Sequence, residues 1–151
     1  MGKPLSEVER AYLAGLVDGD GAIMAVIEKH SEKLFGFRVR IEIKITQFHR
    51  QDVGWLPAET GVGRIRKNRN THEWIVRDQK AVAWLFEMIA PYVRCKANQV
   101  AIAQQIVSRP IGSLEDLVQV ARLADTLSSF NVRSRLRRKN FAAMIQEGVL
   151  P

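Results

Sequence analysis

The sequence has a single cysteine, few aromatic residues and no long apolar run. Cys95 cannot form an internal disulfide by itself, which is typical of proteins in a reducing compartment. No apolar stretch approaches the length needed to cross a membrane, and the N-terminus lacks a signal-peptide pattern. The histidines His30, His49 and His72 do not have the spacing of a metal site. We therefore expect an intracellular protein that is neither secreted nor bound in a membrane.

Acidic residues are also in deficit. The 23 Lys and Arg outnumber 16 Asp and Glu, which gives a net charge of +7 and a pI near 10.0. This balance favours a polyanionic partner, and nucleic acid before a membrane surface. The length of 151 residues and the hydrophobic fraction of 46% predict one globular domain over residues 1–151, with no linker that divides it.

The most informative stretch is residues 13–21, which read Leu-Ala-Gly-Leu-Val-Asp-Gly-Asp-Gly. A helix here would place Ala11, Gly15 and Gly19 along one face, where small side chains let another backbone approach. Asp18 and Asp20 fall at the C-terminal end of that helix, where the helix dipole disfavours negative charge. An ordinary Asp-Gly turn is the alternative interpretation. Stability alone does not explain acids at this end of a helix, which favours a functional role for the stretch.

The stretch resembles the motif of the LAGLIDADG homing endonucleases and differs from it only at Val17 and Gly19. The resemblance implies that this helix lies at a two-fold interface and that Asp20 binds a catalytic Mg²⁺ or Mn²⁺. It also implies that the carbonyl of Gly19 is an accessory metal ligand. Gln47 is similar in position to a residue that orders the water network, and Lys96 to a basic residue near the scissile phosphate.

The two peripheral assignments have simpler alternatives. Gln47 can serve as a hydrogen-bonding residue at a strand end, and Lys96 can be a solvated cation at a helix start. Arg94 competes with Lys96 for the place beside the phosphate. For Asp18 the sequence offers no role beyond shaping the turn. The motif occurs once, which predicts a homodimer with contact through Ala11, Gly15 and Gly19.

Hydrophobic periodicity predicts the remaining elements. Ser6 and Glu9 form a capping box, so the first helix is expected from about residue 7 to 18. Apolar and charged residues alternate strictly over 37–47, which is typical of a strand with one buried face. The other predicted strands are 22–28, 64–67 and 72–77; the other predicted helices are 81–90, 96–108, 113–129 and 134–147, with a short helix or irregular linker over 49–60. This order is an α+β fold, αββαββα, with an antiparallel sheet packed on helices and C-terminal helices added.

The strand faces turned away from the core are predicted to read DNA. Arg suits guanine, Asn adenine and Glu cytosine, while apolar side chains meet thymine methyl groups. The predicted contacts are Met24, Val26, Glu28, Arg38, Arg40, Glu42, Lys44, Arg64, Arg66, Asn68, Glu73, Ile75 and Arg77. A cluster near the C-terminus is assigned to phosphates; it comprises Arg133, Arg135, Arg137, Arg138 and Lys139. The alternatives are a solvated sheet face with cross-strand ion pairs and a cluster that only aids solubility.

These observations favour a site-specific endonuclease that cuts double-stranded DNA and depends on a divalent metal. A strand of about nine residues spans roughly 30 Å, or about nine base pairs. Two subunits would then read a near-palindromic site of roughly 20 base pairs. The resemblance further implies an intron-encoded or free-standing protein of the homing type. A DNA-binding regulator without cleavage and an RNA maturase that assists splicing are the alternatives, and the few exposed aromatics favour duplex DNA over RNA.

Overall fold

The computed structural model describes residues 1–131 and 140–148. Its sheet has four antiparallel strands in the order β1-β2-β4-β3. The strands are β1 (Gly21–Lys29), β2 (Phe37–Gln47), β3 (Arg64–Asn68) and β4 (Thr71–Val76). The helices are α1 (Glu7–Asp20), η1 (Arg50–Asp52), α2 (Leu56–Thr60), α3 (Gln79–Ile89), α4 (Ala97–Ser108), α5 (Leu114–Asn131) and α6 (Phe141–Gln146). The predicted α+β fold with αββαββα order is confirmed.

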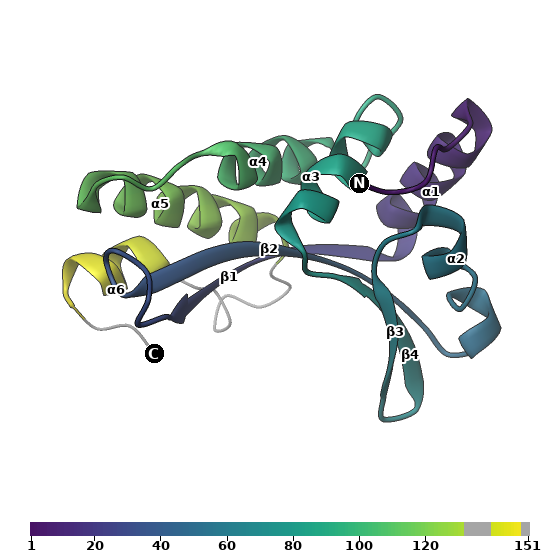
Figure 1. The fold of residues 1–151 in the computed structure, drawn as a ribbon, viewed down its shortest axis with the longest axis horizontal. Coiled ribbons are helices and arrows are strands. Elements are labelled where there is room, and N and C mark those ends of the chain that lie inside the picture. The colour runs from purple at the N-terminus through teal and green to yellow at the C-terminus, as the bar shows by residue number, and fades with distance from the viewer. Residues whose placement is uncertain (132–139, 149–151) are drawn as a thin grey trace.

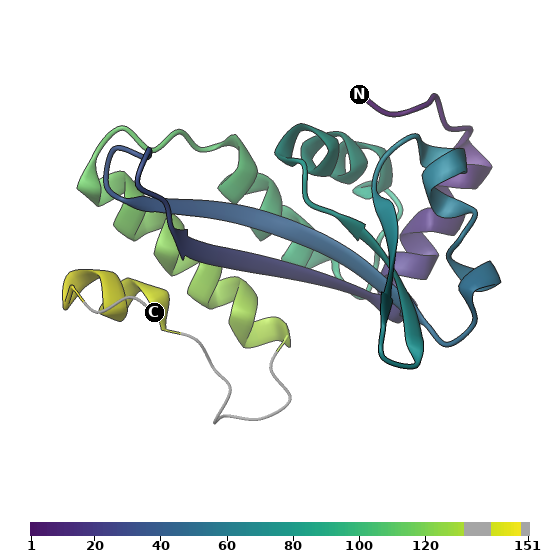
Figure 2. The same ribbon diagram turned by 60° about the horizontal axis from the view of Figure 1, so that its bottom comes forward.

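The sheet separates two sides of the molecule. In Figure 1, α3, α4 and α5 lie above the long strands, and the β3–β4 hairpin projects from the sheet on the opposite side. Figure 2 shows β1 and β2 running side by side along most of the length of the molecule. Among the described residues, no helix is both long enough and apolar enough to cross a membrane.

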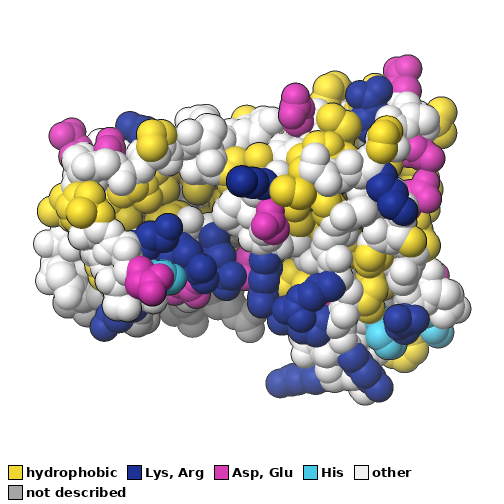
Figure 3. All heavy atoms as spheres, viewed as in Figure 1, with side chains coloured by type: hydrophobic (Ala, Val, Ile, Leu, Met, Phe, Trp, Pro, Cys, Tyr) yellow, Lys and Arg dark blue, Asp and Glu magenta, His cyan; other side chains and the backbone are white. Residues whose placement is uncertain are grey.

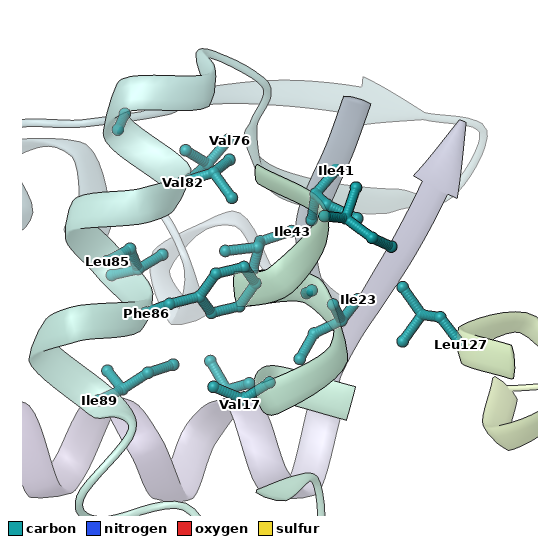
Figure 4. Packing of buried hydrophobic residues seen from close by; sticks show 14 of the residues in the cluster. Val17, Ile23, Ile41, Ile43, Val76, Val82, Leu85, Phe86, Ile89 and Leu127 are labelled. Atoms are coloured by element: carbon teal, nitrogen blue, oxygen red, sulfur yellow. The ribbon is translucent and has the colours of Figure 1, made fainter. Parts of the chain in front are cut away.

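Alternation along the strands determines the core. Ile41, Ile43 and Ile45 of β2 are fully buried, as the period-two pattern predicts. In Figure 4, Phe86 and Ile89 of α3 point toward the strands. Burying each such side chain stabilises the fold by about 1.5–3 kcal/mol relative to leaving it exposed. One face of the sheet is thereby closed by helices, and the other is left for polar and charged side chains.

Some element boundaries differ from the prediction. Helix α1 extends two residues further than expected, because the N–H of Gly21 still donates to the carbonyl of Val17. Helix α4 begins at Ala97, since Lys96 has a non-helical backbone and is the N-cap. Helix α5 starts after Ser113, whose hydroxyl accepts from the N–H of Asp116, and continues to Asn131. Of the last predicted helix, 134–147, residues 134–139 lie outside the described part of the chain.

Candidate active site and nucleic-acid interface

Helix α1 places Asp20 at the point where the chain enters the sheet. The predicted capping box starts the helix: the hydroxyl of Ser6 accepts from the N–H of Glu9, and Glu9 accepts in return from the N–H of Ser6. At the other end, a Cβ on residue 21 would lie 2.7 Å from the carbonyl oxygen of Val17. Glycine is therefore required there for the chain to pass directly from α1 into β1. Asp20 is exposed at this junction.

Gln47 contacts Asp20 directly. Its side-chain amide donates to Asp20 Oδ2 over 2.7 Å. Gln47 is the last residue of β2, and the pairing of β2 with β1 brings this strand end to the end of α1. Among the described residues, no other hydrogen bond reaches the Asp20 carboxylate, so Oδ1 is available to a ligand.

A cleft of about 610 Å³ opens beside Asp20. Its lining comes from α1, β1, the start of α4 and the end of α5, and consists of Gly19, Asp20, Gly21, Ala22, Met24, Cys95, Lys96, Gln99, Phe130 and Asn131. The three residues predicted to be catalytic are thus brought together, since Asp20 and Lys96 share the cleft and Gln47 is bonded to Asp20. The competing residue Arg94 is exposed and does not line the cleft.

Several residues of this region were not predicted. Phe130 and Asn131 reach the cleft from α5, and the Asn131 amide donates to the carbonyl of Ile23 in β1. Asp18 binds the backbone N–H groups of Arg94 and Lys96, at 2.7 and 3.0 Å. For the contacts of Asp18, the only signal in the sequence was the presence of an acid at the unfavourable end of a helix. No local pattern indicated its partners.

The small-residue face of α1 is open. Ala11, Gly15 and Gly19 are exposed, while Leu13, Ala14 and Val17 on the other side are buried. Apart from the adjoining residues of α1 itself, a Cβ added at Gly15 or Gly19 would meet no atom of the described residues within 4 Å. The described part of the chain therefore gives no packing reason for glycine at these two positions.

The sheet face opposite the helices carries alternating charges joined by ion pairs. Figure 3 shows Lys and Arg side chains gathered over the lower face and along the β3–β4 hairpin. Glu28 pairs with Arg38, and more distantly with Arg40 at 3.6 Å. The Arg38 guanidinium that donates to Glu28 holds the pKa of this carboxyl below its ordinary value. A set of pairs, rather than a row of isolated cations, covers this face.

Three residues of the predicted reading face are buried, contrary to the expectation that they are exposed. Glu42, Glu73 and Ile75 keep only 7%, 1% and 2% of their surface accessible. Alternation places them on the predicted face, but neighbouring long side chains cover them. Ile75 lies in register between Lys44 of β2 and Arg64 of β3. The correction is that these three residues are not freely accessible on this surface.

The two buried carboxylates are held by cations. Arg40 and Arg77 both reach Oε1 of Glu42, at 3.1 and 3.0 Å. Glu73 accepts from Arg66 at 2.6 Å and from Asn68 at 2.8 Å, and Lys44 lies 3.7 Å away. Burial opposes ionisation of Glu73, but the hydrogen bonds from Asn68 and Arg66 and the nearby charges together hold its pKa below the ordinary value. The carboxylates thereby fix where the cations of the face lie.

Two further points concern the predicted phosphate-binding cluster and the predicted metal site. The basic cluster Arg133, Arg135, Arg137, Arg138 and Lys139 lies outside the described residues. Within residues 1–131 and 140–148, no group of three or more His, Cys, Asp or Glu forms a metal-binding cluster. A metal bound by Asp20 would therefore take its other ligands from backbone carbonyls, water, substrate or a second chain.

A known protein family matches the part of the chain that contains the motif helix and the sheet that follows it. The model of the family described as LAGLIDADG endonuclease matches residues 13–104, which is more than half of the chain. The chain belongs to the LAGLIDADG endonuclease family. It is accordingly a DNA endonuclease, and the family resemblance inferred from residues 13–21 is confirmed.

Two curated LAGLIDADG relatives align with most of this chain. DNA endonuclease I-CreI of Chlamydomonas reinhardtii is 26% identical over 125 residues, covering 80% of this chain and 77% of the relative. DNA endonuclease I-CvuI of Chlorella vulgaris is 27% identical over 148 residues, covering 87% of this chain and 92% of the relative. The alignments extend beyond the LAGLIDADG motif into the hairpins and later helices.

Solved structures show the same LAGLIDADG fold. I-CvuI in complex with the I-CreI DNA target, in the presence of Mg, has a TM-score of 0.83 and 25% identity, and the match covers 93% of this chain and 92% of that chain. A second I-CvuI complex, with its own target, was obtained in the presence of Ca. The archaeal intron-encoded I-Vdi141I, complexed with DNA, shares the fold at a TM-score of 0.79 and 18% identity. The predicted homing-endonuclease fold is thereby confirmed.

Proposed function

We propose that this protein is a homodimeric homing endonuclease that cuts both strands of a long, near-palindromic DNA site in the presence of Mg²⁺. The observation that carries the proposal is the Asp20–Gln47 pair at the rim of the cleft, directly beside the open face of α1. Hydrolysis of one phosphodiester in each DNA strand requires a metal-binding carboxylate, a cation near the phosphate and a second copy of the site. Asp20 with Gln47, Lys96 and the open face of α1 would supply these three features.

The paired face of the sheet is suited to the DNA major groove. β2 has 11 residues, which at about 3.3 Å each corresponds to roughly 36 Å, or about ten base pairs of one half-site. Arg64 and Asn68 are exposed on the hairpin, and Met24 and Val26 give β1 an apolar stripe for thymine methyl groups. The I-CvuI structures, which hold a DNA target, support a DNA duplex as the partner of this chain.

The open face of α1 is suited to the same face of a second copy. Besides the glycines, Val8 and Tyr12 are 78% and 62% exposed on this helix. A helix that is apolar on its inner side and small and apolar on its outer side needs a partner on each. An isologous contact through Ala11, Gly15 and Gly19 would bring the two Asp20 side chains to the axis between the subunits.

Asp20 and the carbonyl of Gly19 fit a hard divalent cation. The helix ends at Asp20, so the carbonyl of Gly19 has no intrahelical partner, and both residues line the cleft. Few protein oxygens with room for water and phosphate suit Mg²⁺, and Mn²⁺ accepts a similar set. A bound divalent ion would neutralise phosphate charge and lower the pKa of a bound water.

The chain's own residues orient this chemistry. Gln47 fixes the Asp20 carboxylate through Oδ2 and leaves Oδ1 for a ligand in the cleft that Asp20 lines. Lys96, on the α4 side of the cleft, can donate hydrogen bonds to the phosphate oxygens and stabilise the negative charge that develops on them. The buried glutamates of the sheet face set the positions of the cations that contact the duplex.

The test is cleavage of a randomised duplex library with Mg²⁺, with wild type beside Asp20→Asn, followed by sequencing of the cut molecules. We expect wild type to cut a near-palindromic site of roughly 20 base pairs and the variant to spare it. If wild type enriches a site by binding but cuts nothing, the protein is a DNA-binding regulator and the metal assignment is wrong. A parallel binding selection from a structured RNA library that enriches a target, with no cut or bound DNA site, would favour the maturase alternative.

A further inference from the structure

Asp18 and Lys96 hold each other through two sets of contacts. The carboxylate of Asp18 accepts from the backbone N–H of Arg94 at Oδ2 and of Lys96 at Oδ1, over 2.7 and 3.0 Å. In return, Nζ of Lys96 donates to the main-chain carbonyl of Asp18 over 2.6 Å. These contacts join the end of α1 to the start of α4 across 78 residues of sequence.

Each contact satisfies a group that a helix end leaves open. The N-cap of α4 has no side-chain hydrogen bond of its own, so the Asp18 carboxylate binds the segment that leads into that helix. The carbonyl of Asp18 lies in the last turn of α1, where carbonyls lack intrahelical donors and a cation is favoured by the dipole. The arrangement explains why an acid is present at the unfavourable end of α1.

The contacts restrain a side chain that lines the cleft. A free lysine samples many rotamers, and fixing it costs about 1.5–2 kcal/mol of conformational entropy. Here the carbonyl of Asp18 occupies one ammonium proton, and the Lys96 backbone is fixed by the Asp18 carboxylate. The bond to Asp18 uses one of the three ammonium protons, and Lys96 lines the cleft that Asp20 also lines. Asp18 itself is not among the lining residues.

We infer that Asp18 is a positioning residue for Lys96, whose ammonium it holds toward the scissile phosphate. The inference rests on the proposed endonuclease function. Asp18 does not touch substrate; it acts by fixing the backbone and side chain of Lys96. Misplacing a catalytic group by about 1 Å costs up to a hundred-fold in rate, and residues that orient a catalytic group contribute roughly ten- to a hundred-fold.

A double-mutant cycle tests the inference. Single-turnover cleavage of the selected site with Mg²⁺ is measured for wild type, Asp18→Asn, Lys96→Met and the double variant. Asn keeps the size of Asp18 but replaces one acceptor with a donor. We expect Asp18→Asn to lower the cleavage rate roughly ten- to a hundred-fold and to change the DNA dissociation constant, measured with Ca²⁺, by less than about threefold. In the Lys96→Met background, Asp18→Asn should have little further effect.

Asp125 provides a matched control. Its carboxylate also accepts two backbone N–H groups at the start of another helix, from Phe141 and Ala142 of α6. Asp125→Asn should lower thermal stability comparably but leave the cleavage rate near that of wild type. A readout independent of cleavage is amide hydrogen exchange, which should accelerate at Arg94 and Lys96 only in the Asp18 variant.

The outcomes separate this inference from the proposed function. If Asp18→Asn lowers the cleavage rate by the same factor in wild type and in Lys96→Met, Asp18 has a purely structural role and the inference is overturned. The proposed function would stand in that case, because wild type still cuts DNA. No cleavage by wild type would overturn the proposed function and the inference together. If Asp18→Asn does not fold, Asp18→Glu, which keeps the charge but moves the carboxylate by one methylene, takes its place in the cycle with the same expected coupling.

Discussion

Gln47 donates a 2.7 Å hydrogen bond to Oδ2 of Asp20, and so joins the end of β2 to the end of α1 across 27 residues of sequence. The donor is a neutral amide and the acceptor is a carboxylate, and such a hydrogen bond is stronger than one between two neutral groups. The bond uses only one of the two carboxylate oxygens, and Asp20 lines the cleft. The Asp20 carboxylate is therefore held in place by Gln47, and the two residues can be tested separately.

Replacing Asp20 by Asn should abolish metal-dependent cleavage without releasing DNA. The variant keeps the size of the side chain but loses the negative charge that would bind the cation, so we expect a rate loss of about a thousand-fold or more, or about 4 kcal/mol. Gel-shift titration with Ca²⁺ should give a dissociation constant close to that of wild type. Cleavage by this variant at the wild-type rate would contradict the assignment of Asp20.

Replacing Gln47 by Ala should lower the rate less than the loss of Asp20. The carboxylate keeps its charge but loses the donor that orients it, and such orienting residues contribute roughly ten- to a hundred-fold. Single-turnover cleavage at saturating protein isolates this effect from binding. Thr46→Ala, at the exposed neighbouring position of β2, is the control and should cut as wild type. An unchanged rate in Gln47→Ala would limit Gln47 to strand-end packing.

Replacing Gly15 by Leu should separate folding from assembly. Outside the adjoining residues of α1, a Cβ at this position meets no atom of the described residues within 4 Å, and leucine has a helix propensity higher than that of glycine by about 0.8 kcal/mol. The monomer should therefore remain folded, with no loss of thermal stability arising from α1 itself. The close approach of a second α1 would be blocked, so analytical ultracentrifugation should show monomers and cleavage should be lost. A folded Gly15→Leu dimer with normal activity would place the interface elsewhere.

Replacing Glu73 by Gln should destabilise the protein at neutral pH. Breaking a buried carboxylate from its cationic partners costs about 2 kcal/mol here, since Arg66 remains partly solvated. The pKa of Glu73 is depressed in the folded protein, so its stabilisation is present above the ordinary value near 4.5 and is lost as the pH falls through the folded pKa. Denaturant titrations should show a clear difference from wild type at pH 7 that shrinks in acid, below about pH 4.

The same variant should alter DNA binding. Arg66 and Asn68 would lose the carboxylate that holds them, so discrimination between the selected site and random duplex should decrease. Glu32→Gln, in the exposed loop between β1 and β2, removes a charge without removing a buried pair and is the control. Equal loss of stability in both variants would contradict the role of the buried pair.

Glu59 should behave in the opposite way. Its hydrogen bond with Glu9 and the charge of that carboxylate raise the pKa of Glu59 above its ordinary value. A raised carboxyl pKa stabilises the folded state at low pH, and this contribution is lost as the pH rises through the folded pKa. Glu59→Gln should therefore melt at a higher temperature than wild type at pH 7, because the repulsion between the carboxylates is removed.

The advantage of Glu59→Gln should disappear near pH 4, where the wild-type side chain carries its proton. Thermal melts followed by circular dichroism at pH 7 and pH 4 measure both ends of this range. Glu87→Gln changes an exposed glutamate of α3 and corrects for the general effect of charge. A variant that is less stable than wild type at pH 7 would contradict the repulsion between Glu9 and Glu59.

Much of the fold could be predicted because its signals are local. Period-two alternation over residues 37–47 is a property of consecutive side chains, and it located β2 at its observed bounds. The capping box at Ser6 and Glu9 fixed the start of α1 for the same reason. The motif at 13–21 indicated both the helix and its acids, since spacing along one helix sets which residues share a face.

Burial on the sheet face could not be predicted from alternation. Alternation states which side of the strand a residue takes, but Glu42, Glu73 and Ile75 are buried by side chains of neighbouring strands. Those neighbours depend on strand order and register, which long-range pairing decides. The same holds for the depressed pKa of Glu73, whose partners Asn68 and Arg66 come from β3 and Lys44 from β2.

The sequence by itself determined the family, the order of the elements and the acid at the end of the motif helix. Only the tertiary structure decided that Gln47 bonds to Asp20, that Asp18 holds the backbone at Lys96, and that these residues share a cleft with the end of α5. The physical reason is that a hydrogen bond between distant residues depends on how helices and strands pack. Local spacing carries no information on that packing.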